Sequence, residues 1–435
     1  MEAGPTIGTG RAARLRLGLT ATVGYGSLAG LVAMCALLSL AAAASPGFLV
    51  PANRSRLPDW IAGVFAHSGV SLTGRGFVFL LMTLCVGYAV ALVCRPALDP
   101  RPVVITIGVL IAILTLAPPL LSGDLFSYIA YARMGVVHGV NPYAHGPVAI
   151  SPDPVLPFTH WLGTRSVYGP VFTLTSYALA PLGLTVSLWG LKALTGLAAG
   201  GLVALVWAVA RRLDHDPLLA AMVVGLNPLF LVYGVGGGHN DVWMLCLAMA
   251  GVLAVLVHRE PAGAAALAAS VAVKASTAII APFMLIGARR RGALVAAAVV
   301  SALVLAAVAF GVFGSHGLGF LVQLERHQNL TSSSSWPVTL SGYFGGIAHV
   351  RTLGRIVFVV VTIGLLLASW RGLIGWISAA GWTLLALAVT SPWLLAWYLF
   401  WPLPFAAVAR DRRLLAATLF AQLLFLSHRL PQLAG

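Results

Sequence analysis

The sequence predicts an all-α, polytopic membrane protein. Of its 435 residues, 60% are hydrophobic and 9% are charged, and the mean hydropathy is +0.96. Apolar runs of about twenty residues recur from end to end, and each is long enough to cross a hydrocarbon core of roughly 30 Å. Helices satisfy their own backbone hydrogen bonds in lipid, so repeated runs of this length indicate helical spans.

The apolar spans can be placed from the sequence alone. They are expected at 19–45, 76–95, 102–121, 184–210, 217–235, 242–257, 293–313, 353–370, 372–390, 392–409 and 412–428. Two further apolar segments are interrupted: 166–182 contains Pro170 and Pro181, and 262–288 contains Lys274 and Pro282. We expect both to be re-entrant or broken helices, because neither tolerates an uninterrupted crossing.

The basic residues set the orientation of the chain. The net charge is +15, and the arginines form short clusters between apolar spans. This scattered distribution argues against a nucleic-acid partner. The clusters are Arg11, Arg14 and Arg16; Arg211 and Arg212; Arg289 to Arg291; and Arg410, Arg412 and Arg413. The positive-inside rule puts them in the cytoplasm if 166–182 and 262–288 do not fully cross. The prediction is one transmembrane domain, 1–435, with roughly 11–13 transmembrane helices and short helices in its outer-face loops.

The outer face then receives the segments 46–75, 122–165, 234–241 and 314–352. Segment 122–165 begins with SGDLFSYIAYARM, in which Asp124 directly follows an apolar span. In a helix, Asp124, Ser127, Tyr128 and Tyr131 share one face. Asp124 is a candidate catalytic base; alternatively, Ser122 or Asp124 simply caps the helix.

Two polar turns accompany Asp124 in the outer loops. The turn GVNPYAHGP, rich in glycine and proline, is expected to hold His138, Asn141 and Tyr143 in a small volume. The turn GGGHND at 236–241 combines three glycines, which let a backbone approach a ligand closely, with His239, Asn240 and Asp241. The alternative for the second turn is an N-cap for the span that follows.

Lysine is rare in this chain. Of 26 basic side chains only Lys192 and Lys274 are lysines, and both lie in apolar segments. A lysine at the position of Lys274 needs a carboxylate or an anionic ligand, or it loses its proton. Lys192 lies on a plainer helix face, where we expect snorkelling or packing.

The last outer segments contain further candidates. Arg326 and His327 lie in the polar 314–352 loop. Two roles are open for this loop: it binds a phosphate or a sugar, or it is a solvated linker. Trp397 and Tyr398 belong to an aromatic junction that forms an interfacial belt or stacks on a sugar ring.

Five stretches occur in an order that resembles a known family. They are SGDLFSYIAYARMGVVHGVNPYAHGP, SVYGPVF, GGGHND, the Lys274 segment and SPWLLAWYLFWPLP. Over roughly residues 100–410 the chain resembles the actinobacterial polyprenol-phosphomannose-dependent alpha-1,6-mannosyltransferases, membrane glycosyltransferases of the GT-C type. One departure is AWY in place of PWY at the last junction.

The resemblance implies a GT-C fold and a hexosyltransferase that inverts the sugar. It implies a polyprenyl phosphomannose donor, a mannan-type, lipomannan-like glycolipid acceptor and alpha-1,6 links, formed at the outer, periplasmic face of the plasma membrane. Asp124 matches the acidic residue of the first outer loop, the base. The superfamily often has a second acidic neighbour, but Leu125 and Phe126 follow here. No cofactor and no metal ligand is therefore predicted, although a divalent metal is not excluded.

The residues fit this chemistry independently. A single displacement needs one general base for the acceptor hydroxyl, not the two carboxylates of a retaining glycosidase. The leaving phosphate needs positive charge or hydrogen-bond donors, for which the candidates are Lys274, Arg133, Arg326 and His239. Tyr128, Asn141, Tyr143 and Tyr168 are expected to shape the sugar site, with membrane lipids around it.

Two alternatives stay open. The first is a transferase for another polyprenyl-phosphate sugar, such as arabinofuranose. The second is a transporter or flippase for a lipid-linked sugar, but inverted repeats, which are typical of transporters, are not visible in the sequence.

Overall fold

The computed structural model describes residues 7–44, 47–51, 57–66, 68–327 and 329–434, and side chains from residue 18 onward except at 327 and 428–434. The side chains of Arg11, Arg14 and Arg16 therefore lie outside the described residues. Throughout the described ranges the regular elements are helices, which confirms the all-α fold.

The α-helices are α1 (Ile7–Ala44), α2 (Asp59–Ala62), α3 (Gly74–Val93), α4 (Pro100–Leu116), α5 (Asp124–Val136), α6 (Pro170–Leu179), α7 (Gly183–Arg212), α8 (Pro217–Gly225), α9 (Asp241–Leu256), α10 (Glu260–Val273), α11 (Ala281–Gly287), α12 (Arg291–Phe313), α13 (Gly319–His327), α14 (Trp336–Leu340), α15 (Ile347–Trp370), α16 (Trp376–Thr390), α17 (Leu403–Val408) and α18 (Arg412–Ala434). The short 3-10 and π elements are η1 (Gly63–Phe65), η2 (Arg95–Ala97), η3 (Pro147–Ile150), η4 (Leu156–Phe158), η5 (Ala180–Leu182), η6 (Phe230–Gly236), η7 (Ala275–Ile280), η8 (Gly314–His316), η9 (Ser341–Tyr343) and η10 (Ala396–Phe400).

Several helices are long and apolar enough to cross a membrane. In the described part of the chain they number 5, or up to 6 if α8 and η6 form one bent span, and the shorter apolar helices have 10–17 residues. The chain is thus a multi-pass membrane protein. The count of roughly 11–13 crossings stays a prediction, because the shorter helices cross only if they combine across their breaks.

Two expected spans are not straight helices. The span predicted at 217–235 is bent by 65° between α8 and η6. The bend contains Pro228, and the side-chain oxygen of Asn227 accepts a hydrogen bond from the backbone of Phe230.

The span predicted at 392–409 consists instead of an extended segment, η10 and α17. Pro402 and Pro404 lie between or within these short helices, so a continuous helix does not form.

The two segments expected to be broken are interrupted. Segment 262–288 divides at Lys274, whose extended backbone (φ −152°, ψ 120°) separates α10 from η7. Segment 166–182 contains α6 and η5, which end before Gly183, a residue with φ of 89°. With 10 residues, α6 alone spans only about half of a hydrocarbon core.

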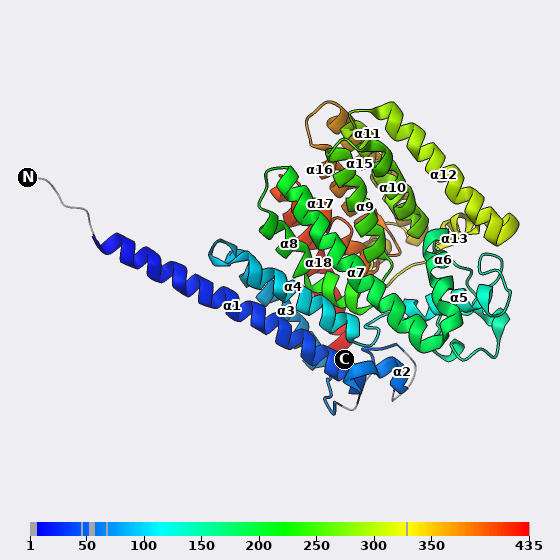
Figure 1. The fold of residues 1–435 in the computed structure, drawn as a ribbon, viewed down its shortest axis with the longest axis horizontal. Helices are drawn as coiled ribbons and strands as arrows, with labels where there is room; N and C mark the ends of the chain where they lie inside the picture. Colours follow the sequence, from blue (N-terminus) through cyan, green and yellow to red (C-terminus); the bar gives the residue numbers. More distant parts are fainter. Residues whose placement is uncertain (1–6, 45–46, 52–56, 67, 328, 435) are drawn as a thin grey trace, which may run out of the picture.

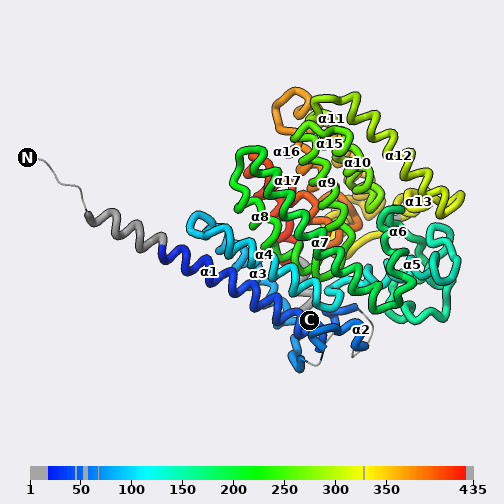
Figure 2. Tube along the Cα trace, in the orientation of Figure 1, coloured from blue at the N-terminus to red at the C-terminus, as the bar shows by residue number. Residues whose placement is uncertain are grey.

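Figures 1 and 2 show how the helices are arranged. α1 packs along α3 and α4, and its N-terminal part projects away from the helix bundle. In the bundle, α9 packs against α7 and α10, and α10 packs against α12. α5, α6 and α13 lie together at one side of this bundle.

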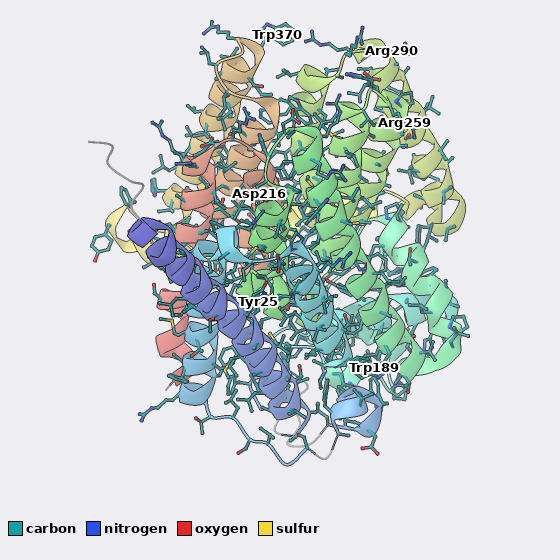
Figure 3. All side chains as sticks on the ribbon, turned by 60° about the vertical axis from the view of Figure 1, so that its left-hand side comes forward. Tyr25, Trp189, Asp216, Arg259, Arg290 and Trp370 are labelled. Carbon is teal, nitrogen blue, oxygen red and sulfur yellow. The ribbon has the colours of Figure 1, made fainter. Side chains whose placement is uncertain are left out.

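The two ends of the bundle differ in composition. Figure 3 shows Arg259, Arg290 and Trp370 together at one end and Trp189 at the other. At the second end, the Trp189 indole donates a hydrogen bond to the carbonyl of Trp60 in α2, and the Trp60 ring packs against Phe126 of α5. The turns that contain Arg259 and Arg290 therefore lie at the opposite end of the bundle from Trp189, to which α5 is joined through Trp60.

Candidate active site

Asp124 is the first residue of α5, but it does not cap the helix with its side chain. The Ser122 hydroxyl accepts a hydrogen bond from the Asp124 backbone N–H at 3.2 Å. The N-cap position of α5 is Gly123, so neither of the two capping residues considered, Ser122 or Asp124, occupies it. Among the described residues, the Asp124 carboxylate accepts no hydrogen bond; its close neighbour is His239 Nδ1, 3.5 Å from Asp124 Oδ2. The carboxylate is available for chemistry.

The GGGHND turn brings His239 to Asp124. It follows η6, a π-helix of a kind that is frequent at functional sites. A Cβ on Gly237 would lie 2.3 Å from the Tyr233 carbonyl oxygen, and Gly238 has φ of +69°. The tight turn itself thus requires glycine at these two positions, while the expectation that the glycines let a ligand approach the backbone stays a prediction.

The Lys192 side chain holds the end of η6 and the start of this turn in place. Its ammonium donates to the carbonyl oxygens of Leu114 (2.7 Å), Val235 (3.2 Å) and Gly236 (2.7 Å). The side chain is fully buried. The expected snorkelling is wrong, since three converging carbonyls solvate the ammonium inside the protein.

Asp241 and Lys274 meet beside this turn. Lys274 Nζ lies 2.7 Å from Asp241 Oδ1, which also accepts a 2.7 Å hydrogen bond from the Trp401 indole. The break in the helix at Lys274 lets this side chain reach a carboxylate at the start of α9. Asn240 occupies the N-cap position of α9, but its side chain makes no capping bond.

Aromatic rings enclose the cluster. The His239 ring stacks on Trp397, with centroids 3.8 Å apart, and Lys274 Nζ lies 5.0 Å from the centre of the Tyr398 ring. Tyr128 Oη is 3.4 Å from Asn240 Oδ1. The Tyr168 ring packs edge-on against Tyr128, with centroids 4.7 Å apart.

Burial changes the proton affinities of Asp124 and His239. Desolvation raises the pKa of Asp124 to about 6, with the Lys274 charge lowering it and the Asp241 charge raising it. Desolvation and the charges of Lys274 and Lys192 hold the pKa of His239 well below its ordinary value. His239 is therefore neutral near pH 7, and Asp124 changes its charge at the edge of the physiological range.

Several polar atoms of the cluster are buried without partners. Both ring nitrogens of His239, Asn240 Nδ2 and Asp241 Oδ2 have no hydrogen-bond partner within the described structure. Buried polar groups are normally satisfied, so four such atoms on adjacent residues indicate a place where a ligand or water binds.

Arg133 and His138 lie elsewhere. Arg133 makes a bidentate pair with Asp153, with contacts of 2.8 to 3.0 Å, and His138 Nε2 is 2.7 Å from the same carboxylate. The expectation that Arg133 meets a phosphate is not supported by this placement, because its charge is already balanced by Asp153. The pair ties α5 to the loop that follows it.

Asn141 and Tyr143 are also committed to the fold. Asn141 Nδ2 donates to the Phe313 carbonyl at 2.7 Å, and Tyr143 Oη donates to the Tyr168 carbonyl at 2.8 Å. Tyr143 is 1% exposed and packs on Phe313. The turn GVNPYAHGP thus anchors the segment after α5 to the end of α12.

Arg326 is an exposed residue of α13, outside the buried cluster. The side chain of His327 lies outside the described residues. Trp401 belongs to the aromatic junction that the sequence marks as an interfacial belt or a sugar-stacking surface, but its bond to Asp241 was not predicted: the two residues lie 160 positions apart, and no local pattern signals that contact. Within the described chain, no group of three or more His, Cys, Asp or Glu side chains is placed to hold a metal ion.

Comparisons with known proteins agree with these motifs. Residues 27–290 match the family model described as alpha-(1→6)-mannopyranosyltransferase, N-terminal domain, and residues 345–432 match the MptB C-terminal domain. The chain is 30% identical over 395 residues to alpha-(1→6)-mannopyranosyltransferase A of Mycobacterium tuberculosis, covering 79% of this chain and 74% of that protein. It is 31% identical over 189 residues to the Corynebacterium glutamicum protein of the same name, covering 41% and 37%. No solved structure matches significantly.

Proposed function

Because the chain belongs to the alpha-(1→6)-mannopyranosyltransferase family, we propose that it transfers mannose from a polyprenyl phosphomannose donor to a mannan-type glycolipid. The chain is a membrane-embedded mannosyltransferase. Beyond mannosyl transfer itself, the proposal specifies the lipid donor, the acceptor and the alpha-1,6 link. It also specifies inversion at the anomeric carbon and a site at the outer face of the plasma membrane.

The observation that carries the proposal is the environment of the Asp124 carboxylate and its effect on the pKa of that group. Its carboxylate has no hydrogen bond among the described residues, its side chain is 19% exposed, and its neighbour His239 is buried. A raised pKa of about 6 makes it a stronger base than an ordinary carboxylate, while it is still ionised at pH 7. An acid that only stabilised the fold would have its oxygens satisfied.

The reaction needs one base in this position. Asp124 takes the proton of the acceptor 6-hydroxyl as that oxygen forms its bond to the anomeric carbon of mannose. The bond from that carbon to the phosphate oxygen breaks, and the polyprenyl phosphate leaves with the electron pair. Attack opposite to the leaving group inverts the anomeric centre. Base catalysis of this kind contributes about 10²–10⁴-fold.

Lys274 and its neighbours suit the leaving phosphate. The ammonium has Asp241 as a partner on one side and is 18% exposed on the other. Hydrogen-bond donors that remain unused in the cluster include Asn240 Nδ2. Fixed donors in a site shielded from water stabilise the negative charge that develops on the phosphate.

A groove beside Lys274 suits the polyprenyl chain. A cavity of about 390 Å³ lies between α10 and α12, with α6, α11 and α13 also contributing. Alanine and leucine residues line most of it, and its wall includes Ala272 and Ala278, on either side of the break at Lys274. Both interrupted segments contribute, since Pro170 also lines it. A lipid in this groove would place its phosphate near Lys274.

The position of the basic turns supports an outer-face site. Arg259 and Arg290 lie at the end of the bundle opposite Trp189 and α2 (Figure 3). Basic loops favour the cytoplasm, so α5 and Asp124 would then face outward. The donor phosphate lies at a membrane interface, where this cluster could meet it.

The test is transfer by membranes that contain the protein. We expect labelled polyprenyl phosphomannose to mannosylate an alpha-1,6-linked oligomannoside, with a new alpha-1,6 link in the product. Transfer only from an arabinofuranosyl donor would replace the mannose assignment. Movement of the labelled donor between leaflets without a glycan product would favour the transporter alternative. A chelator series in the same assay measures any metal dependence.

A further inference from the structure

A second cavity lies beside Trp397. It has a volume of about 340 Å³, near the lower end of the range typical of small-molecule sites. Six separate parts of the chain contribute to its wall: the segment 47–51, Leu121 before α5, the π-helix η6, the two segments around residues 332–334 and 394–397, and Phe425 of α18. The proposed function leaves this cavity unassigned.

Three of its lining residues connect it to the Asp124 cluster. Leu121 has φ of 59°, an uncommon value for a residue with a side chain, and lies three positions before Asp124. Its backbone N–H donates to the Leu49 carbonyl at 2.7 Å, which holds it in place. Tyr233 belongs to η6, and Trp397 carries the stacked His239 ring. The cavity therefore shares its walls with the proposed catalytic site.

The serine segment of the cavity is fixed in place. The Ser332 backbone N–H donates to the Pro392 carbonyl at 2.9 Å, and the Ser335 hydroxyl donates to the Ser391 carbonyl at 2.8 Å. These bonds join the 314–352 loop to the junction that contains Trp397. Here the loop forms a wall of the cavity, so it is more than a solvated linker.

The chemistry of the wall selects an uncharged polar ligand. Ser332, Ser334 and Tyr233 bring hydroxyl groups, and Trp397 and Phe48 bring aromatic rings. Hydroxyls beside aromatic rings suit a sugar, which has polar edges and apolar C–H faces. None of the described residues that line the cavity is charged. A phosphate group would find no counter-charge here, in contrast to the groove beside Lys274.

We infer that this cavity binds the non-reducing end of the acceptor glycan, an uncharged hexose unit or two. The inference rests on the proposed function. It separates the two substrates: the donor enters through the alanine-lined groove by α10 and α12, and the acceptor approaches from the cavity by Trp397. The His239 ring stacks on Trp397 and lies 3.5 Å from the Asp124 carboxylate, so an acceptor bound beside Trp397 would bring its hydroxyl toward the proposed base.

The test fills the cavity without touching the Asp124 cluster. Ser332→Leu puts a larger side chain at a partly exposed lining position, and Ser333→Leu makes the same change at the exposed neighbour that does not line the cavity. We expect Ser332→Leu to raise the KM for an alpha-1,6-linked oligomannoside by about tenfold or more, with the donor KM unchanged. Ser333→Leu should change neither KM.

Other outcomes overturn the inference. An unchanged acceptor KM in Ser332→Leu, or a raised donor KM instead, would mean that the cavity is not the acceptor site. Equal thermal unfolding of both variants in detergent shows that each is folded, and Ser332→Ala serves as the milder second variant. Direct binding of a trimannoside, measured by calorimetry without donor, separates this inference from the proposed function. Binding that is lost in Ser332→Leu supports the cavity even if the donor sugar is not mannose.

Discussion

Asp124 and Asp153 belong to the same segment, 122–165, and they have opposite surroundings. Asp153 is fully buried and accepts hydrogen bonds from Arg133, in a bidentate pair, and from the Val155 backbone, with His138 at 2.7 Å. The Asp124 carboxylate accepts no hydrogen bond from the described residues and lies 3.5 Å from His239 Nδ1. Burial acts to raise the pKa of both, but at Asp153 the hydrogen bonds of Arg133 and Val155 outweigh it and the net pKa is lowered.

The difference separates a structural acid from a candidate catalyst. A carboxylate whose oxygens are satisfied contributes to stability and has little affinity for another proton. A buried carboxylate without donors holds its proton more strongly and is the better base. The two lysines show the same contrast between a structural and a candidate functional group. Lys192 donates hydrogen bonds to three carbonyl oxygens, whereas Lys274 has one carboxylate partner and a partly exposed side chain.

The largest expected effect is on catalysis at Asp124. Asp124→Asn keeps the shape of the side chain but removes the base, so kcat should fall by about 10³-fold. Thermal unfolding should hardly change, because the carboxylate accepts no hydrogen bond within the described structure. The measurement is initial mannosyl transfer by purified protein. Undiminished transfer by the variant would refute the assignment of Asp124 as the base.

Asp153→Asn should have the converse effect. It breaks a buried pair with Arg133, whose side chain is 13% exposed, and leaves that charge without its partner. The free energy of unfolding should fall by about 3 kcal/mol, while kcat per folded molecule stays close to normal. Thermal unfolding in detergent and an active-site titration measure the two quantities. A stable but inactive variant would contradict the structural role of Asp153.

The pH dependence should report on Asp124 alone. Transfer should fall through pH 6 and be about tenfold lower at pH 5 than at its plateau, because the pKa of Asp124 is raised to about 6. Protonation of Asp124, whose pKa is raised, favours the folded state, whereas the lowered pKa of His239 makes the folded state less stable as the pH falls below the ordinary pKa of histidine. The two effects on stability therefore oppose each other as the pH falls to 5, while activity falls. Asp153 contributes stability that is lost only below its ordinary pKa, because its folded pKa is lowered. An activity loss that parallels unfolding would contradict this separation.

The smallest expected effect concerns Tyr143. Tyr143→Phe removes the hydroxyl that donates to the Tyr168 carbonyl and lies 3.1 Å from Thr173 Oγ1. We expect a loss of about 1 kcal/mol in unfolding free energy and unchanged kinetic constants. A raised KM with normal stability would return Tyr143 to the sugar site proposed from sequence.

The predicted site residues that the structure brings together share one property. Asp124, the HND turn and Lys274 are polar or ionisable groups at the edge of, or inside, apolar segments. Such groups are costly in a membrane unless they pair or act, so composition alone marks them. The same argument predicted the break at Lys274, which the structure places between α10 and η7.

The predicted site residues that the structure places in other contacts were grouped by nearness along the chain. Arg133, His138, Asn141 and Tyr143 follow Asp124 closely, yet their partners are Asp153, Phe313 and Tyr168. Which way a loop side chain points depends on the segment packed against it, and sequence distance does not carry that information.

By itself, the sequence determined an all-α membrane protein, the arginine-rich turns and a small set of costly polar residues, because lipid penalises each exception to an apolar pattern. Only the tertiary structure decided which acid is satisfied and which is not. That distinction depends on contacts between residues far apart in the chain, such as the 2.7 Å bond from Trp401 to Asp241. The physical reason is that a carboxylate's proton affinity is set by the donors and charges that surround it in space.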